Sequence, residues 1–144
     1  MKFEEIINGF SNITGVIPEK SGNGYSFFVD DKFEVYCYKG PEGSCVIESN
    51  IHPIPEDEFQ KEEFLKKILK TNLGRMYFQN EVISIGENEN EIVIFKRILP
   101  QEVFSTEDIK KIFENFFNSL EFWYDLLLNT QDDAPVSQQM IFFP

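Results

Sequence analysis

Histidine, cysteine and positive charge are scarce in this sequence of 144 residues, which has one His, two Cys and 13 Lys or Arg against 25 Asp or Glu. A Ser-His-acid or Cys-His catalytic arrangement would have to use the single His52, because both mechanisms need an imidazole base. His52 lies between Ile51 and Pro53 at the end of an expected strand, and we interpret it as a capping or surface residue. The sequence contains no C-x-x-C, H-E-x-x-H, Gly-rich phosphate loop or G-x-S-x-G motif. We therefore expect no catalytic, metal or cofactor site, and a protein that is not an enzyme.

The shortage of positive charge and of long apolar runs argues against nucleic acid and membranes as partners. A net charge of −12 argues against direct binding to nucleic acid or to an anionic membrane, because both need a cationic surface. No segment approaches 18 consecutive apolar residues, and the first ten residues have no apolar run of signal-peptide length. The expected location is therefore the cytoplasm.

The two cysteines, Cys37 and Cys45, flank the turn sequence "GPEG" at 40–43. A hairpin loop of two or four residues would set Cys37 opposite Val46 and point the thiols to opposite faces, whereas a three-residue loop would set them opposite each other. In a reducing compartment we expect two free, buried thiols. A disulfide remains the less favoured alternative.

Aromatic residues, in contrast, are abundant: 16 Phe, five Tyr and one Trp. A chain of 144 residues is most simply one domain and can bury a sufficient core without a disulfide or metal. Aromatic side chains dominate the energetics of both cores and interfaces. Their excess therefore fits either use, and the strand pattern has to separate the two.

Apolar spacing and turn residues predict a helix at 3–10, a three-strand meander, a second helix, two further strands and a long last helix. Pro55 is expected at the first position of the second helix and Gly74 just past its end. Ser105 and Asp108 predict a capping box for the last helix, which is expected to end near residue 130. The expected strands are 25–29, 33–39, 44–51, 75–85 and 91–99. The order α-β-β-β-α-β-β-α predicts an α+β fold in which helices pack on a twisted antiparallel sheet, with a domain at 1–130 and a tail at 131–144.

Both faces of the expected strands carry rings. In 33–39, for example, Phe33 and Cys37 share one face, and Tyr36 and Tyr38 share the other. The first and last helices could cover one face, which would leave rings exposed on the second face as an interface. The alternative is a three-layer core in which the middle helix covers the second face.

Three segments resemble the class I type III secretion chaperones, the Tir chaperone or CesT-like family. "FLKKILKTNLG" resembles the second helix of that family, "RMYFQNEVISIGENENEIVIFKRIL" resembles the hairpin that follows, and "IFENFFNSLEFWYDLL" resembles its terminal helix. The resemblance implies a homodimer that binds the N-terminal chaperone-binding segment of a secreted effector and keeps it soluble and secretion-competent without nucleotide. It implies dimer contacts at Phe64, Ile68, Tyr77 and Ile83. It implies client contacts at Phe3, Ile7, Phe10, Phe28, Tyr36 and Phe95.

Other interpretations remain open at this point. An acidic immunity or anti-toxin protein could use the same composition to neutralise a toxin by surface binding. A carrier with an aromatic pocket for a small apolar ligand, or an enzyme of unfamiliar type, is a third possibility. The tail at 131–144 ends in "MIFFP", which is either an apolar strand that adds to a sheet edge or an end without a role.

Overall fold

The computed structural model describes the backbone of residues 1–140 and the side chains of residues 1–129. The helices of this part of the chain are α1 (Phe3–Thr14), α2 (Glu58–Arg75) and α3 (Thr106–Met140). The strands are β1 (Glu19–Ser21), β2 (Gly24–Val29), β3 (Phe33–Lys39), β4 (Cys45–Pro53), β5 (Val82–Ile85) and β6 (Glu91–Ile98). Two short 3-10 helices, η1 (Pro41–Gly43) and η2 (Pro100–Glu102), lie in the connections.

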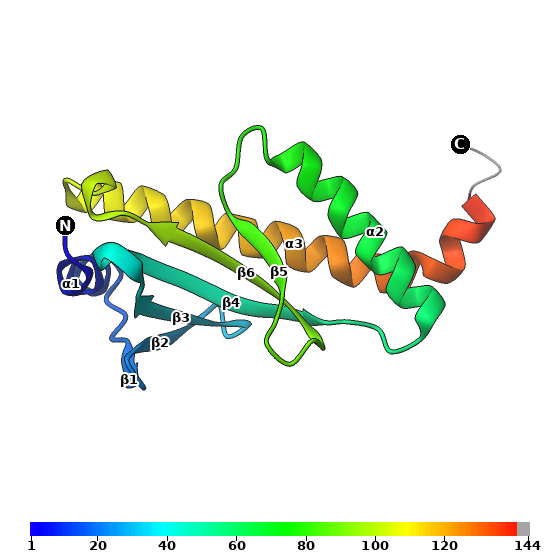
Figure 1. Cartoon of the computed structure of the whole chain (residues 1–144), viewed down its shortest axis with the longest axis horizontal. Coiled ribbons are helices and arrows are strands. Elements are labelled where there is room, and N and C mark those ends of the chain that lie inside the picture. Colours follow the sequence, from blue (N-terminus) through cyan, green and yellow to red (C-terminus); the bar gives the residue numbers. More distant parts are fainter. Residues whose placement is uncertain (141–144) are drawn as a thin grey trace.

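The strands form one antiparallel sheet in the order β1-β2-β3-β4-β6-β5 (Figure 1). The predicted α+β fold and the predicted order of elements are therefore confirmed, with the short strand β1 as an addition. The sequence "PEKSGNG" at 18–24 predicted a loop, but its residues Glu19–Ser21 pair with β2. Each end strand of the sheet, β1 and β5, pairs with one neighbour only.

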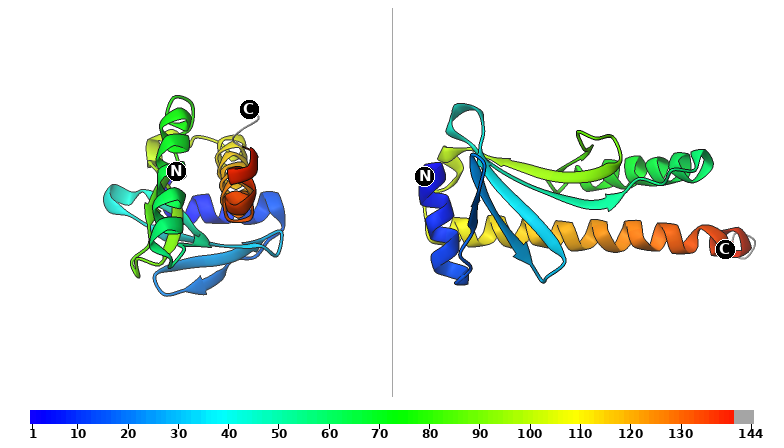
Figure 2. Two further views of the ribbon diagram at one scale, coloured as in Figure 1. Left: turned by 90° about the vertical axis from the view of Figure 1, so that its right-hand side faces the viewer. Right: turned by 90° about the horizontal axis from the view of Figure 1, so that it is seen from below.

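Helices α1 and α3 cover one face of the sheet, which we call the inner face (Figure 2). Phe10 of α1 joins the layers, because its ring centroid lies 4.6 Å from that of Phe27 in β2 and 4.5 Å from that of Phe113 in α3. Phe33 of β3 meets Tyr124 of α3 edge-on at 5.4 Å. The rings at these alternate positions therefore form the core, as the strand pattern predicted.

Helix α2 packs beside α3 and leaves the other face of the sheet, the outer face, uncovered (Figures 1 and 2). The alternative of a three-layer core closed by the middle helix is therefore wrong. The start of α2 also differs from the prediction at Pro55. Asp57 is the N-cap, and its carboxylate accepts a hydrogen bond of 2.9 Å from the backbone N–H of Gln60, which satisfies a free donor of the first turn.

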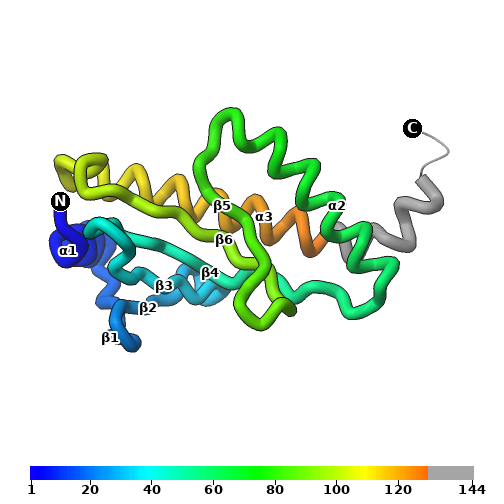
Figure 3. Tube along the Cα trace, viewed as in Figure 1, coloured from blue at the N-terminus to red at the C-terminus, as the bar shows by residue number. Residues whose placement is uncertain are grey.

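The junction between α2 and β5 lies later in the sequence than expected. Gly74 does not adopt a positive φ, and α2 continues through it to Arg75, whose carbonyl accepts bonds of 3.0 and 2.8 Å from the N–H groups of Phe78 and Gln79. These bonds turn the chain before it enters β5, a path that can be followed in Figure 3. Strand β5 is therefore the short Val82–Ile85 rather than the predicted 75–85.

His52 and the cysteines lie inside the protein. A register irregularity between Asn50 and His52 interrupts the alternation of β4, so His52 is buried with its ring centroid 5.6 Å from that of Phe64. The expectation of a surface histidine is wrong for this reason. Cys45 pairs with Lys39, two positions from Cys37, so both cysteines face the core, where they are free and buried. The thiol of Cys45 beside it and burial both raise the pKa of Cys37.

The capping box of α3 is confirmed, because the N–H of Asp108 donates to Ser105 Oγ at 3.3 Å and the N–H of Ser105 donates to the Asp108 carboxylate at 3.2 Å. The helix continues to Met140, beyond the expected end near residue 130. The "MIFFP" strand falls largely outside the described residues, since 141–144 are not described. In the part of the chain that the structure describes, no helix has the length and apolar character needed to cross a membrane.

Candidate functional site

The outer face of the sheet carries two rings and a carboxylate in one row. Reading across the register, Ser26 of β2 pairs with Tyr36, Tyr36 with Glu48 of β4, and Glu48 with Phe95 of β6, which pairs with Val82. Tyr36, Glu48 and Phe95 are each only partly buried, and Phe28, nearby on the same face, is 61% exposed. A partner that lies on this face would therefore contact apolar rings and a carboxylate together.

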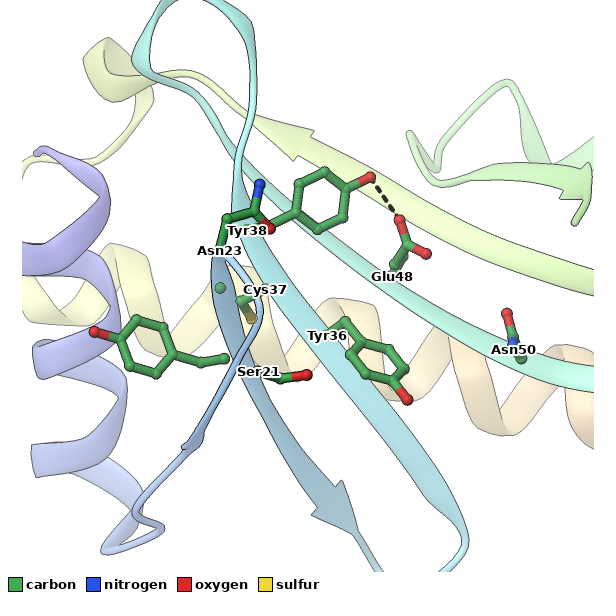
Figure 4. A pocket seen from close by; sticks show the side chains of 9 residues that line it. Ser21, Asn23, Tyr36, Cys37, Tyr38, Glu48 and Asn50 are labelled. Carbon is green, nitrogen blue, oxygen red and sulfur yellow. Dashed lines mark hydrogen bonds between the residues drawn. The ribbon is translucent and has the colours of Figure 1, made fainter. Parts of the chain in front are cut away.

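A hollow of about 330 Å³ lies where this row meets the β1–β2 turn (Figure 4). Tyr36, Tyr38, Glu48 and Asn50 line it from β3 and β4. Gly24 also lines it, and a Cβ at this position would lie 2.2 Å from the carbonyl oxygen of Cys37. The strands can approach this closely only with glycine.

Carboxylates raise the pKa values of two tyrosines that line the hollow, Tyr36 and Tyr38. The Tyr38 hydroxyl donates to Glu48 Oε1 at 2.5 Å, and burial together with this carboxylate raises the pKa of Tyr38 to about 12. A hydrogen bond to Glu34 raises the pKa of Tyr36, with smaller effects of burial and of the charges of Glu34 and Glu48. Both shifts have the sign expected for a negative electrostatic potential.

A second exposed surface lies on α2 and the turn after it. Leu69, Leu73 and Met76 repeat at helical spacing and are 68%, 66% and 65% exposed. Tyr77 and Phe78 continue this surface into the turn, with Tyr77 88% exposed. We call these five residues the α2 stripe. Exposed apolar surface of this extent on a small protein marks an interaction site.

A buried network of charged and polar side chains lies next to the α2 stripe, at the end of α2. Arg75 Nε donates to Glu81 Oε2 at 2.9 Å, Ser119 Oγ donates to Glu81 Oε1 at 2.8 Å, and Trp123 Nε1 donates to Glu81 Oε2 at 3.3 Å. The guanidinium of Arg75 also lies 4.0 Å from the ring centroid of Phe122 in α3. Burial raises the pKa of Glu81, but the hydrogen bonds from Arg75, Ser119 and Trp123 and the charge of Arg75 outweigh it and lower the pKa below its usual value. The network therefore connects α2, the start of β5 and α3.

The residues expected to contact a client fall into two groups. Phe28, Tyr36 and Phe95 lie on the outer face, where they are exposed or half-buried. Phe3, Ile7 and Phe10 are 6%, 4% and 2% exposed and form part of the core under α1. Phe10 also lines an apolar groove of about 240 Å³ between α1 and α3.

The residues expected at a dimer contact divide in the same way. Phe64 and Ile68 are 1% and 5% exposed and face the interior of the protomer. Tyr77 lies on the α2 stripe, and Ile83 in β5 is half-buried. Sequence reasoning did not single out Leu69, Leu73 and Met76, although Leu65, Leu69, Leu73 and Met76 repeat every three or four residues and mark a second apolar side of α2.

The described side chains, residues 1–129, contain no group of three or more His, Cys, Asp or Glu that could hold a metal ion. The side chains that do gather in this part of the chain are rings and carboxylates on an open sheet face and apolar residues on a helix. Both are suited to binding another polypeptide chain.

The profile of the Tir chaperone protein (CesT) family matches residues 5–124, and the chain belongs to this family. No curated protein sequence matches it. A similar solved structure is that of the HopA1–SchA chaperone–effector complex, with a TM-score of 0.66, 10% identity and coverage of 85% of this chain and 93% of that chain. A chain of the ExsC–ExsE complex gives 0.65, 14% identity and coverage of 88% and 97%. The Yersinia pestis type III secretion chaperone SycH, in complex with a stable fragment of YscM2, gives 0.60, 11% identity and coverage of 84% and 98%.

Proposed function

We propose that this protein is a type III secretion chaperone that binds the N-terminal chaperone-binding segment of a secreted effector and keeps that effector soluble and secretion-competent. Membership of the CesT family supports the proposal, as does the similarity in structure to the HopA1–SchA chaperone–effector complex and to the type III secretion chaperone SycH. The observation that carries it is the uncovered outer face of the sheet with its row of Tyr36, Glu48 and Phe95.

An extended client segment fits this surface for a physical reason. A strand can add its backbone to an unpaired sheet edge and place alternate side chains on an adjoining surface. The edge strand β1 pairs with β2, which carries Phe28, and β3 with Tyr36 is the next strand in the sheet, so one client could use both the edge and the outer face. We propose Phe28, Tyr36 and Phe95 as client contacts. Phe3, Ile7 and Phe10 would then act mainly by holding α1 and its groove in place.

We propose that a homodimer forms through the α2 stripe and the neighbouring β5, with Tyr77 and Ile83 at the contact and Phe64 and Ile68 fixing the angle of α2 from within. Burying one large aliphatic side chain contributes about 1.5–3 kcal/mol, so a symmetric pair of stripes could supply enough free energy for association. Leu73→Asp should yield a monomer in sedimentation, whereas Ile17→Asp, at a position that is 84% exposed elsewhere on the protein, should leave the dimer intact. A wild-type protein that is monomeric at micromolar concentration would refute this part.

The proposed role consists of binding alone. It assigns no catalytic step, consumes no nucleotide and requires no cofactor, and it places the protein in the cytoplasm because a secretion chaperone meets its client before export. We further propose that residues 1–130 form the chaperone domain and that 131–144 form a separate tail that competes with the client. Deleting 131–144 should then raise client affinity, and unchanged affinity would refute the competition.

Capture of the tagged protein from its native host tests the central proposal. We expect mass spectrometry to identify a secreted protein that is retained through its N-terminal region. The folded Tyr36→Asp variant should lose this protein, because a carboxylate would replace a ring at the centre of the row. Asn88→Asp, in the exposed β5–β6 turn, adds the same charge and should retain it. Equal retention by both variants would contradict the proposed client surface.

A further inference from the structure

The charged residues of the sheet are sorted by face. Every glutamate within the described strands lies on the outer face: Glu19, Glu34, Glu48 and Glu91 occupy positions that alternate with the buried residues or pair with outer-face partners. The strand lysines lie in the inner-face register, since Lys20 pairs with Tyr25, Lys39 with Cys45 and Lys96 with Ile47. Within the described strands, the outer face therefore carries the glutamates and the inner-face register carries the lysines, which makes the outer face acidic.

Arg97 is the one cation of the described strands on the outer face, and it is already engaged. Its Nη2 lies 3.4 Å from the carboxylate of Glu42 in η1. Glu48 has no ion-pair partner among the described residues; it accepts the hydroxyl hydrogen of Tyr38. Its carboxylate therefore lies on a face where the one cation of the described strands, Arg97, already pairs with Glu42.

Rings surround this carboxylate. Glu48 lies between Tyr36 and Phe95 in the register and, together with Tyr36 and Tyr38, lines the hollow of about 330 Å³ (Figure 4). A carboxylate flanked by aromatic faces provides two attractions for a cationic side chain, the ion pair itself and the attraction of the cation to the negative face of a ring. An apolar or anionic side chain at the same place would gain neither.

We propose that this hollow is a subsite for a lysine or arginine side chain of the bound client segment, with Glu48 as the counter-ion and Tyr36 and Tyr38 as the walls. The inference rests on the proposed function and adds a chemical requirement to it. The client segment is basic at one position that faces the chaperone, next to positions whose apolar side chains contact Phe28 and Phe95. Arginine fits the site better than lysine, because its planar guanidinium can stack on a ring while it bonds to a carboxylate.

Two synthetic peptides that differ in charge alone test the subsite. The probe is a labelled acetyl-Ser-Val-Ser-Val-Ser-Arg-Ser-Val-Ser-Val-Ser-amide, in which arginine and the valines share one face of an extended strand. Its partner has citrulline, the neutral isostere, in place of arginine. With the wild-type protein at low salt, we expect the arginine peptide to bind about fivefold more tightly, the product of a modest ion pair and a cation–π contact. This preference should fall as salt is raised.

Matched variants separate the subsite from the general effect of net charge. Glu48→Gln keeps an oxygen acceptor for Tyr38 and removes the charge, so the preference for arginine should fall below about twofold. Glu87→Gln, in the exposed β5–β6 turn, changes the net charge equally and should keep the preference.

Each other outcome overturns the inference and bears differently on the function. Equal binding of the two peptides to the wild-type protein would remove the cation subsite and leave extended-peptide binding in place. An equal loss of preference in Glu48→Gln and Glu87→Gln, or no loss in Glu48→Gln, would assign the effect to overall charge. Absence of binding by both peptides would overturn the docking of an extended segment on this face, whereas capture from the native host tests the chaperone function independently.

Discussion

Replacing Glu81 by glutamine should destabilise the protein more than any comparable change of a surface carboxylate. The side chain of Glu81 is 3% exposed, and that of its partner Arg75 is 12% exposed. Glutamine keeps one oxygen acceptor, but it removes the negative charge and leaves the guanidinium without its counter-ion. Breaking a buried pair from one side costs about 3–5 kcal/mol. Because solvent reaches Arg75 in part and glutamine still accepts one bond, we expect about 2–4 kcal/mol.

Thermal unfolding followed by circular dichroism at pH 7 measures this loss. At about 3 °C per kcal/mol for a chain of this size, Tm should fall by about 6–12 °C. Glu87→Gln, in an exposed turn, should shift Tm by about 1 °C or less. The double variant Arg75→Met with Glu81→Gln should lose less than the sum of the two single variants, because it leaves no buried charge unpaired. A Tm for Glu81→Gln equal to that of Glu87→Gln would refute the argument.

The same structure supports three further predictions. The folded pKa of Glu81 lies below its ordinary value of 4.5, so this carboxylate stabilises the fold above pH 4.5 and loses that contribution as pH falls through the folded pKa. The wild-type protein should therefore lose more stability than Glu81→Gln between about pH 5 and pH 3. Urea unfolding at a series of pH values measures this difference. Gly24→Ala should lower the free energy of unfolding in urea by about 1–3 kcal/mol, because its Cβ would meet the Cys37 carbonyl. Gly74→Ala, with open space around its Cβ in α2, should raise the free energy of unfolding by about 0.5–1 kcal/mol. A change of the same sign in both variants would contradict the glycine contacts. Phe10→Ala should cost about 3–5 kcal/mol because the ring is 2% exposed and contacts two neighbouring Phe rings, and a loss below about 1 kcal/mol in chemical denaturation would place this ring outside the core.

Local patterns predicted the fold well where one physical cause dominates. The alternation in β3 separates Phe33, Val35 and Cys37 from Tyr36 and Tyr38, and burial follows it. Side chains alternate across a strand whatever its neighbours. The start of α3 was equally predictable, because a capping box is formed by residues three positions apart.

Features that depend on distant contacts were not predictable. The end of α2 lies past Gly74 because Arg75 bonds to Glu81, which is held in turn by Ser119 and Trp123 of the distant helix α3. His52 is buried because a register irregularity in β4 turns it toward Phe64. Neither contact partner can be inferred from neighbouring residues in the sequence.

The candidate site was predictable in part for the same reason. The family resemblance implied that Phe28, Tyr36 and Phe95 lie on the outer sheet, but only the packing of α2 beside α3 leaves that face uncovered. Helix α2 has two apolar sides, and the sequence cannot tell which one faces inward. The structure buries Phe64 and Ile68 and exposes Leu69 and the rest of the α2 stripe.

The position of a bound client on the protein tests the account most directly. The measurement is chemical-shift mapping of the isotope-labelled protein during titration with the N-terminal segment of the captured secreted protein. We predict that the largest changes lie in β2, β3 and β4 around Tyr36 and Glu48, on the sheet face that no helix covers. Changes confined to α3, with those strands unaffected, would contradict the account.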